Sequence, residues 1–302
     1  MLTLSEFSPV TLSDQHLFSD HYARYPQVHS DNLFSNMVCW NHYANYSYLK
    51  IGDSIVLSST ILGKTKFRPP IGPRNPDLLD EVFSLAVRGG DEAPLVLVDT
   101  PTRAWIHDLY PDLAFQEDRD YFEYVYRAED LARLPGGNYL SIRRQLNRFR
   151  KNCHPELEEM SPENLGDVKV FLQKWCEWKQ CKDHPFLSFE KDAVLYAIAH
   201  LGALPLEGLL LRVKGEVGAM AIFEALNKDT AVIHFEKGLP DCEGIYKAIN
   251  AETAAFLEDR YPFINRESDM GEPGLREAKM RYHPHHMVEV SYVLREDLER
   301  VI

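Results

Sequence analysis

Three consecutive β-rich runs, separated by short polar turns, constrain the fold of this chain more than any other feature. The runs cover residues 209–213, 217–225 and 231–236, and the turns contain Lys214-Gly-Glu and Asn227-Lys-Asp. Strand-forming runs that follow one another so closely predict an antiparallel meander. The order of the elements predicts an α+β domain, because the meander is followed by a helix through 245–257, a strand at 263–266, a short helix at 274–282 and a strand at 288–294.

The first part of the chain has its own alternation of strands and helices. The patterns predict strands at 54–62, 94–99 and 120–126 and helices at 78–86 and 102–110. The segment Leu134-Pro-Gly-Gly-Asn138 then interrupts the pattern, which starts again after it. We therefore predict two domains, residues 1–135 and 136–302, and this agrees with a length of 302 residues.

The charge of the chain excludes several classes of protein. Asp and Glu number 46 and Lys and Arg number 33, which gives a net charge of −13, and 45% of the residues are hydrophobic. An acidic surface repels phosphate backbones and anionic membranes, and this much apolar material favours a folded core over disorder. The composition predicts a globular enzyme rather than a general nucleic-acid binder.

Cysteine content and the N-terminal segment indicate the compartment. The five cysteines are odd in number and scattered, which predicts reduced thiols; they are Cys39, Cys153, Cys176, Cys181 and Cys242. The first residues lack the basic and apolar regions of a signal peptide, and the longest uncharged stretch, 32–49, is too rich in amides to cross a membrane. We expect a cytoplasmic protein without a transmembrane segment.

A basic cluster stands out against the acidic composition. Its members lie within nine residues that contain no acid: Arg143, Arg144, Arg148, Arg150 and Lys151. On a helix, Ile142, Leu146 and Phe149 form an apolar stripe, and Arg144, Arg148 and Lys151 share another face. Two interpretations stay open: a solvated helix face, or a phosphate-binding patch formed by arginines.

The segment from Asn265 to Lys279 is the second candidate site. A strand leads into a loop that contains Asp269 and two glycines, and the following helix carries Arg276 and Lys279 three residues apart. Loops between a strand and a helix often carry binding or catalytic groups, because amides and a positive helix dipole gather there. The alternative is a structural loop in which Arg276 pairs with Asp269 or Glu267.

The third candidate is the end of the last meander strand, His234-Phe-Glu-Lys237. Regular strand alternation places His234 and Glu236 on one face, where they are able to take a proton from an attacking amine or hydroxyl. A structural histidine is the alternative interpretation. The sequence His283-Pro-His-His286 is interpreted as a surface turn, since no further ligands lie nearby, and we predict no metal site.

Four stretches of the sequence, together with Ser35-Asn36 and Trp40, resemble the phosphatidylglycerol lysyltransferase C-terminal-domain family over nearly the whole chain. They are Tyr121-Phe-Glu-Tyr-Val-Tyr126, Gly137-Asn-Tyr-Leu-Ser-Ile-Arg-Arg-Gln-Leu-Asn-Arg-Phe149, His234-Phe-Glu-Lys-Gly238 with Gly244-Ile-Tyr246, and Asn265-Arg-Glu-Ser-Asp-Met-Gly-Glu-Pro-Gly-Leu-Arg-Glu-Ala-Lys279. The resemblance implies an α+β fold of two tandem GNAT-like domains, with mixed, mainly antiparallel sheets flanked by helices. Family members that are fused to membrane segments transfer an aminoacyl group from charged tRNA to a lipid head group.

The resemblance also bears on the donor. In ordinary acetyltransferases, the loop between the meander and the next helix holds the pyrophosphate of coenzyme A with backbone amides. In this chain that loop reads Lys237-Gly-Leu-Pro-Asp-Cys-Glu-Gly244. Asp241 and Glu243 repel a pyrophosphate, and Pro240 lacks an amide donor. Coenzyme A is therefore disfavoured as a cofactor, and an aminoacyl-tRNA or another acyl donor is expected.

These observations lead to two hypotheses for the function. In the first, the C-terminal domain transfers an aminoacyl or acyl group from an activated ester to an amine or hydroxyl of a small-molecule acceptor. Asp269 or Glu236 is the expected base and His234 assists it, whereas the other candidates are expected to bind the substrates: Arg276, Lys279, Asn265, Glu267, Arg143, Arg144 and Arg148. In the second, the chain is a non-catalytic module that binds a small anionic or nucleotide ligand.

Overall fold

The structure, a computed structural model, describes residues 1–302 and divides into two compact units. The first unit contains Met1–Glu123, Ser268–Pro273 and Val288–Ile302, and the second contains Tyr124–Glu267 and Gly274–Met287. This division differs from the expected ranges 1–135 and 136–302. The physical reason is strand pairing, because a strand near the C-terminus completes the sheet of the first unit.

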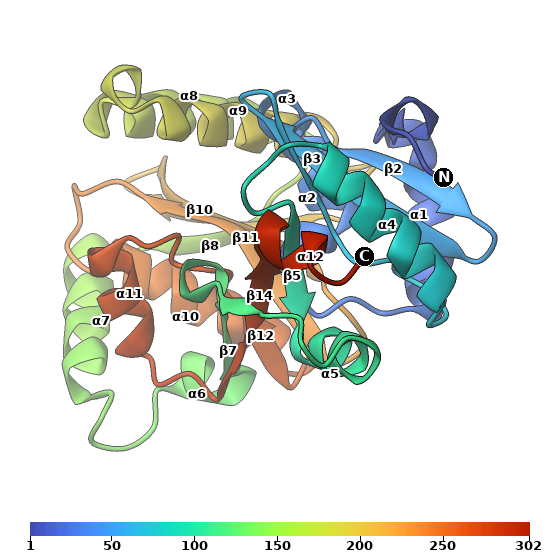
Figure 1. Ribbon diagram of the computed structural model, residues 1–302. Helices are drawn as coiled ribbons and strands as arrows, with labels where there is room; N and C mark the ends of the chain where they lie inside the picture. Colours follow the sequence, from blue (N-terminus) through green and yellow to red (C-terminus); the bar gives the residue numbers. More distant parts are fainter. The chain divides into compact units, whose positions relative to one another are not determined.

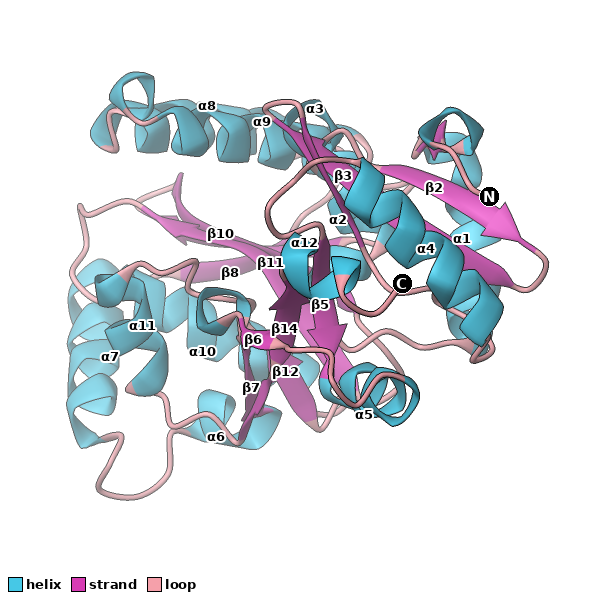
Figure 2. Ribbon diagram, in the orientation of Figure 1, coloured by secondary structure: helices cyan, strands magenta, loops and turns pink.

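The first unit is built on a seven-stranded mixed sheet of order β1-β2-β3-β4-β5-β14-β6 (Figures 1 and 2). Most neighbours are antiparallel, whereas β4 and β5 are parallel. The elements of this unit are β1 (Ser8–Pro9), α1 (Gln15–Arg24), α2 (Phe34–Cys39), α3 (Asn41–Ala44), β2 (Ser47–Ile51), β3 (Ser54–Ile61), β4 (Lys64–Phe67), α4 (Pro76–Arg88), β5 (Leu95–Asp99), α5 (Thr100–Leu109), β6 (Gln116–Glu117), β14 (Val290–Val293) and α12 (Arg295–Glu299).

Helix α4 shows how the sequence specifies the core of the first unit. The Asn75 side chain accepts a hydrogen bond from the Leu78 amide, and Pro76 occupies the first turn, so the helix begins at Pro76, two residues before the expected start. The apolar positions of α4 are buried and pack with Leu298 of α12. The predicted amphipathic helix is confirmed, and its buried face anchors α4 to the sheet.

The second unit contains a seven-stranded sheet of order β13-β7-β12-β11-β10-β9-β8. Strands β9, β10 and β11 form the predicted antiparallel meander, and β11 pairs with β12 in parallel. The elements are β7 (Glu123–Arg127), α6 (Ala128–Arg133), α7 (Leu140–Cys153), β8 (Glu156–Glu159), α8 (Leu165–Trp178), α9 (Pro185–Ala199), β9 (Glu207–Val213), β10 (Glu216–Ala225), β11 (Thr230–Gly238), α10 (Ile245–Leu257), β12 (Phe263–Asn265), α11 (Pro273–Met280) and β13 (His286–Val288).

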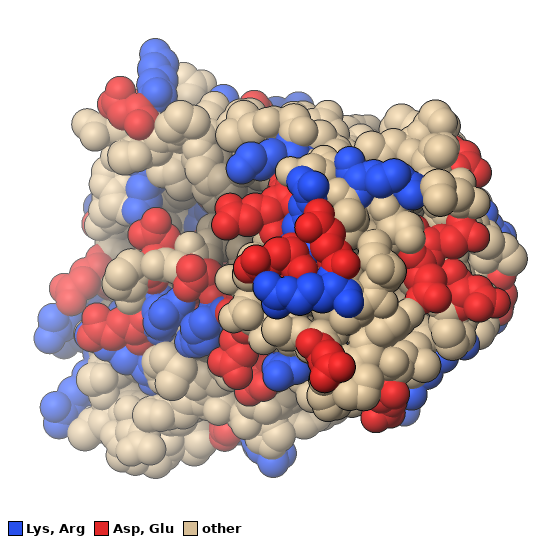
Figure 3. All heavy atoms as spheres, in the orientation of Figure 1, with Lys and Arg blue, Asp and Glu red and all other residues tan.

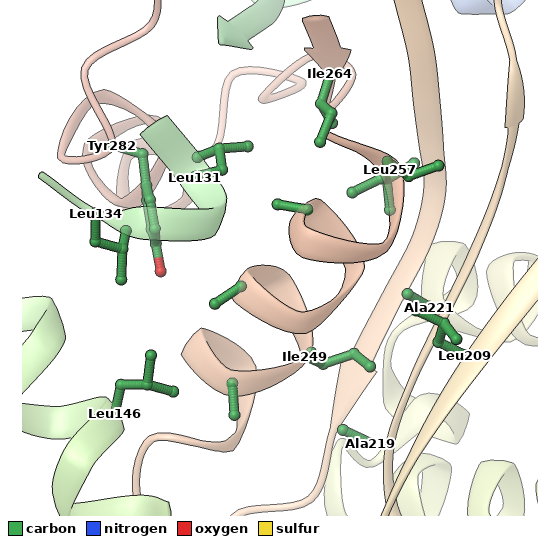
Figure 4. Close-up of a cluster of buried hydrophobic side chains, with 14 of the residues drawn as sticks. Leu131, Leu134, Leu146, Leu209, Ala219, Ala221, Ile249, Leu257, Ile264 and Tyr282 are labelled. Carbon is green, nitrogen blue, oxygen red and sulfur yellow. The ribbon is translucent and has the colours of Figure 1, made fainter. Parts of the chain in front are cut away.

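The core of the second unit lies between its sheet and helices α6, α7 and α10. Figure 4 shows Ile249 and Leu257 of α10 beside Ala221 of the meander, and Leu146 reaches the same cluster from α7. The expected stripe of Ile142, Leu146 and Phe149 is buried there. The prediction of an α+β fold with helices flanking mixed sheets is therefore confirmed for this chain.

The expected strand at 288–294 is two strands that belong to different sheets. Strand β13 ends at Val288 in the second sheet, and β14 begins at Val290 in the first. Glu289 separates them and is exposed. The sequence pattern does not reveal this change, because both strands are compatible with one alternation of apolar and polar residues.

The prediction of five reduced thiols is wrong for four of them. Cys153, the last residue of α7, is bonded to Cys242 in the segment before α10, with 2.03 Å between the sulfur atoms. Cys176 in the last turn of α8 is bonded to Cys181, and Cys39 is a buried free thiol. The first pair is 89 residues apart in sequence and meets because α7 packs on α10. Scattered spacing therefore gave no sign of it.

These disulfides predict a specific pattern of cysteine labelling. When the protein is unfolded without reductant and treated with iodoacetamide, only Cys39 is expected to react. After reduction, all five cysteines should react, and mass spectrometry of the intact chain measures the difference. Alkylation of every cysteine without reductant, in protein purified with its thiol state preserved, would contradict the two bonds.

Candidate functional site

The parallel strands β11 and β12 pair over a short distance and then separate. Their register runs from Thr230 opposite Phe263 to Val232 opposite Asn265, where β12 ends, whereas β11 continues beside β10 to Gly238. Side chains beyond this point approach one another across the separation. We call this region the strand split, and its members are His234, Glu236, Arg266 and Glu267.

On the α10 side of the sheet, Glu236 and Arg266 form an ion pair across the strand split. Nη2 of Arg266 lies 2.9 Å from Oε1 of Glu236, and Nδ2 of Asn250 donates to Oε2 at 3.2 Å. The two charged side chains are 14% and 12% exposed. Burial lowers the pKa of Arg266, but Glu236, Tyr126 and Tyr282 together outweigh this effect and raise the pKa. The arginine therefore stays charged opposite the carboxylate.

On the other side of the sheet, His234 lies between two glutamates. Its Nε2 is 2.8 Å from Oε1 of Glu224 and its Nδ1 is 2.8 Å from Oε1 of Glu267. Burial lowers the pKa of His234, but the hydrogen bonds to both carboxylates outweigh it and raise the pKa to about 10. At neutral pH both ring nitrogens therefore carry protons and donate. In that state His234 has no lone pair with which to accept a proton.

The expectation that His234 and Glu236 share one face of β11 is wrong. Phe223 pairs with Ile233 and Ile222 pairs with Phe235, so His234 is the extra residue of a β-bulge. A bulge changes the alternation of the strand that contains it. Glu236 consequently lies with its partner on the α10 side, whereas His234 turns to Glu224 on the opposite side.

Two of the predicted binding residues hold the chain where it leaves β12. Nζ of Lys279 donates to the carbonyl oxygens of Arg266 and Glu267 at 2.6 and 3.1 Å, and this lysine is 7% exposed. Oδ1 of Asn265 accepts from the Glu267 amide at 2.7 Å, and Asn265 is fully buried. These contacts fix the backbone that carries Arg266 and Glu267. Arg276 lies one turn earlier than Lys279 on α11 and is half-buried.

Asp269 belongs to the segment that packs with the first unit. Its side chain is fully buried and accepts from Nη1 of Arg119 at 3.1 Å and from the Gly271 amide at 3.0 Å. Gly271 adopts φ 77°, and a Cβ there would lie 2.8 Å from Oδ2 of Asp120. The turn is therefore closed around Asp269, whose carboxylate pairs with an arginine of the same unit.

Three residues of the basic cluster on α7 contact other parts of the chain. Nη1 of Arg143 donates to the carbonyl oxygens of Leu134 and Gly136, which ties α7 to the end of α6. Arg148 lies 3.6 Å from Glu243, and Arg150 lies 2.7 Å from Glu252. Figure 3 shows basic and acidic side chains interspersed on the face that it draws. Arg144 and Lys151 are exposed on the helix surface.

Sequence reasoning missed Glu224, Arg266 and the pair formed by Lys237 and Glu190. Nζ of Lys237 lies 2.8 Å from Oε2 of Glu190 and 3.8 Å from the centre of the Trp175 ring, and the residue is 2% exposed. Burial lowers the pKa of Lys237 although Glu190 opposes the change. One sequence signal points to Arg266 and Lys237, because each of them adjoins a predicted site residue. A single charge at the end of an apolar strand was the only sign of Glu224.

The family model described as "Phosphatidylglycerol lysyltransferase, C-terminal" matches residues 22–294 of this chain. The chain belongs to this family. None of the curated proteins matches its sequence.

Similar solved structures include three whose likeness extends over most of this chain. A conserved protein of unknown function from Bacteroides thetaiotaomicron VPI-5482 is 27% identical, with a TM-score of 0.89, and the match covers 95% of this chain and 98% of that one. L-PGS from Bacillus licheniformis is 12% identical, with a TM-score of 0.62 and coverage of 93% and 92%. FemX is 11% identical, with a TM-score of 0.57 and coverage of 98% and 99%.

The expected α+β fold, with mixed, mainly antiparallel sheets flanked by helices, is confirmed, and the likeness to FemX covers nearly the whole chain. Family and fold together indicate an aminoacyl- or acyl-group transferase. None of the helices is both long enough and apolar enough to cross a membrane.

The buried position of His234 predicts how stability depends on pH. Its pKa is about 10 in the folded protein and 6.5 without the fold, so the folded state holds an extra proton between these values. The stabilisation is complete below pH 6.5 and is lost as the pH rises through 10, with a slope of at most about 1.4 kcal/mol per pH unit. Urea unfolding of the wild type at pH 7, 8 and 9 should show this decline.

The His234→Gln variant should lose most of that decline, because glutamine does not titrate. His16→Gln changes an exposed histidine of α1 and is the matched control, for which we expect the slope of the wild type. Equal slopes in the wild type and in His234→Gln would show that His234 is not the group responsible.

Proposed function

We propose that the second unit transfers an aminoacyl or acyl group from an activated ester to an amine or hydroxyl of a small-molecule acceptor. The observation that carries this proposal is the strand split, where ionised side chains from β11 and the end of β12 meet on both sides of the sheet. Acyl transfer requires a group that takes a proton from the nucleophile and a group that stabilises negative charge on the carbonyl oxygen. The strand split offers both kinds of group in one region.

Glu236 is the base that the geometry favours. Its Oε1 lies 2.9 Å from Nη2 of Arg266, and its side chain is not completely enclosed. As the acceptor nitrogen or oxygen attacks the ester carbonyl, Glu236 takes the proton of the nucleophile. When the tetrahedral intermediate collapses, the bond to the ester oxygen breaks and the proton passes to that leaving oxygen. Asp269 is less suited to this role, because it is fully buried and bonded to Arg119.

The other predicted residues take supporting roles in this proposal. Lys279 and Asn265 position the backbone of Arg266 and Glu267, and protonated His234 fixes Glu267 from the opposite side. Arg276 is the candidate for an anion contact. Arg144 and Arg148 are the residues proposed to bind a phosphate of the donor. Arg143 is less suited, since its guanidinium donates hydrogen bonds to backbone carbonyls.

An ester donor such as charged tRNA is favoured over coenzyme A by the start of α10. Gly244 packs on α7 so closely that a Cβ would lie 3.1 Å from the carbonyl oxygen of Gln145. The Ile245 amide donates to the Cys242 carbonyl, and the disulfide from Cys242 holds this segment against α7. The amides that bind a pyrophosphate in ordinary acetyltransferases are therefore partly used within this chain.

A binding module is the second candidate, and one observation favours it. The charged groups of the strand split are already paired: Glu236 pairs with Arg266, and His234 pairs with Glu267 and with Glu224 of β10. Such pairing also suits a site that binds a ligand without reacting with it. Turnover separates the two candidates.

The test is a transfer assay with tRNA charged with radiolabelled amino acids. Soluble amines, hydroxyl compounds and phosphatidylglycerol vesicles serve as separate acceptors, and acetyl-CoA serves as the alternative donor. Glu236→Gln should reduce the rate about 10²- to 10⁴-fold, because the amide cannot accept the proton. Glu216→Gln, an exposed change on β10 of the same sheet, is the matched control and should retain the wild-type rate.

Each outcome has a defined meaning. Equal rates for Glu236→Gln and the wild type would reject Glu236 as the base. Transfer from acetyl-CoA alone would reject the ester donor proposed here. Saturable binding of a charged tRNA or nucleotide without product would support the binding module.

A further inference from the structure

Arg68, the residue after β4, is a buried charge without a counter-ion. The residue is 4% exposed, and its Nε and Nη1 atoms are enclosed without any hydrogen-bond partner. Its backbone is fixed, because the Arg68 amide donates to the Leu57 carbonyl at 3.0 Å. The guanidinium lies over the Tyr46 ring, 5.1 Å from its centre. A cation over an aromatic face gains some electrostatic attraction, but the ring does not supply the oxygen acceptors that these N–H groups require.

The acidic groups of this neighbourhood are used by other residues. The carboxylate of Glu123 accepts from the Ser30 amide at 3.0 and 3.1 Å and from the Ser30 hydroxyl, and Nδ1 of His29 lies 3.4 Å from it. Asp31 accepts from Nδ2 of Asn36 at 3.2 Å. Arg68 belongs to the same region, since its charge acts on the pKa of His29. No carboxylate lies within ion-pair distance of Arg68.

A buried guanidinium without acceptors lowers the stability of the folded state. Enclosed charges in proteins are normally paired, because the protein must replace the solvation that the charge has lost. Unused donors of a buried cation match the oxygens of a carboxylate or a phosphate, which form charge-assisted hydrogen bonds with arginine. Nε and Nη1 are the two guanidinium nitrogens whose donors are enclosed and unused.

We propose that Arg68 anchors a binding site in the first unit for the oxyanion of a small ligand, a carboxylate or a phosphate. The N–H groups of the guanidinium donate to the oxyanion, and Tyr46 packs against the guanidinium. The site lies within the first unit and does not depend on the transfer reaction proposed for the second. A failure of either proposal leaves the other standing.

The test measures thermal stability and binding with two probes, inorganic phosphate and acetate, in separate titrations. Sodium chloride at the same ionic strength is the reference. At least one probe should raise the melting temperature of the wild type above this reference. Arg68→Met should abolish the rise and weaken binding at least 10-fold, whereas Arg74→Met, which changes an exposed arginine of the same unit, should behave as the wild type. Whether phosphate, acetate or both raise the melting temperature identifies the chemistry of the ligand.

Stability without a probe distinguishes binding from a structural role. If Arg68 serves a ligand, Arg68→Met removes an uncompensated buried charge and should melt at the same temperature as the wild type or above it. A melting temperature several degrees lower would overturn the proposal, and so would the same response to both probes and to sodium chloride. Arg68→Lys retains the charge but loses the guanidinium donors. If Arg68→Met fails to fold, a folded Arg68→Lys with binding weakened several-fold supports the proposal, and unchanged binding rejects it.

Discussion

The early end of the pairing between β11 and β12 is the constraint on which the second unit depends. Parallel strands normally satisfy one another's backbone groups along their shared length, but this pair stops after Val232 and Asn265. Beyond this point, ion pairs instead of backbone hydrogen bonds link β11 to the segment after β12. Glu236 and Arg266 form one pair on one side of the sheet, and His234 and Glu267 form the other on the opposite side. Lys279 and Asn265 fix the backbone beyond β12. The candidate chemistry and the local stability of the sheet therefore use the same residues.

Local patterns predicted much of the fold. The meander follows from β-rich runs and tight turns, and α4 follows from a capping Asn75, a proline in its first turn and a regular apolar face. Such features depend on residues within a few positions of one another, so they can be predicted from a single sequence. The division into units depends on β14 joining a sheet formed by residues far earlier in the chain, and nothing local encodes that pairing.

The site was predicted less completely, for related reasons. Glu236, His234 and the segment after Asn265 were recognised as chemically notable, but their partners come from distant strands. The bulge at His234 places it on the side opposite Glu236. Alternation in a strand predicts faces only while the register is regular, and an inserted residue leaves no mark in the composition. The disulfide between Cys153 and Cys242 is likewise a product of helix packing.

The position of β14 has a consequence for the order in which the chain is made. The first unit needs β14 between β5 and β6, and α12 beside α4, yet both elements lie in the last fifteen residues, Val288–Ile302. A ribosome delivers them only after the whole second unit has emerged. Until then, the sheet of the first unit has an open edge at β5. The second sheet lacks only the last residue of β13 at that stage. In this chain, the unit that begins first is the one that is completed last.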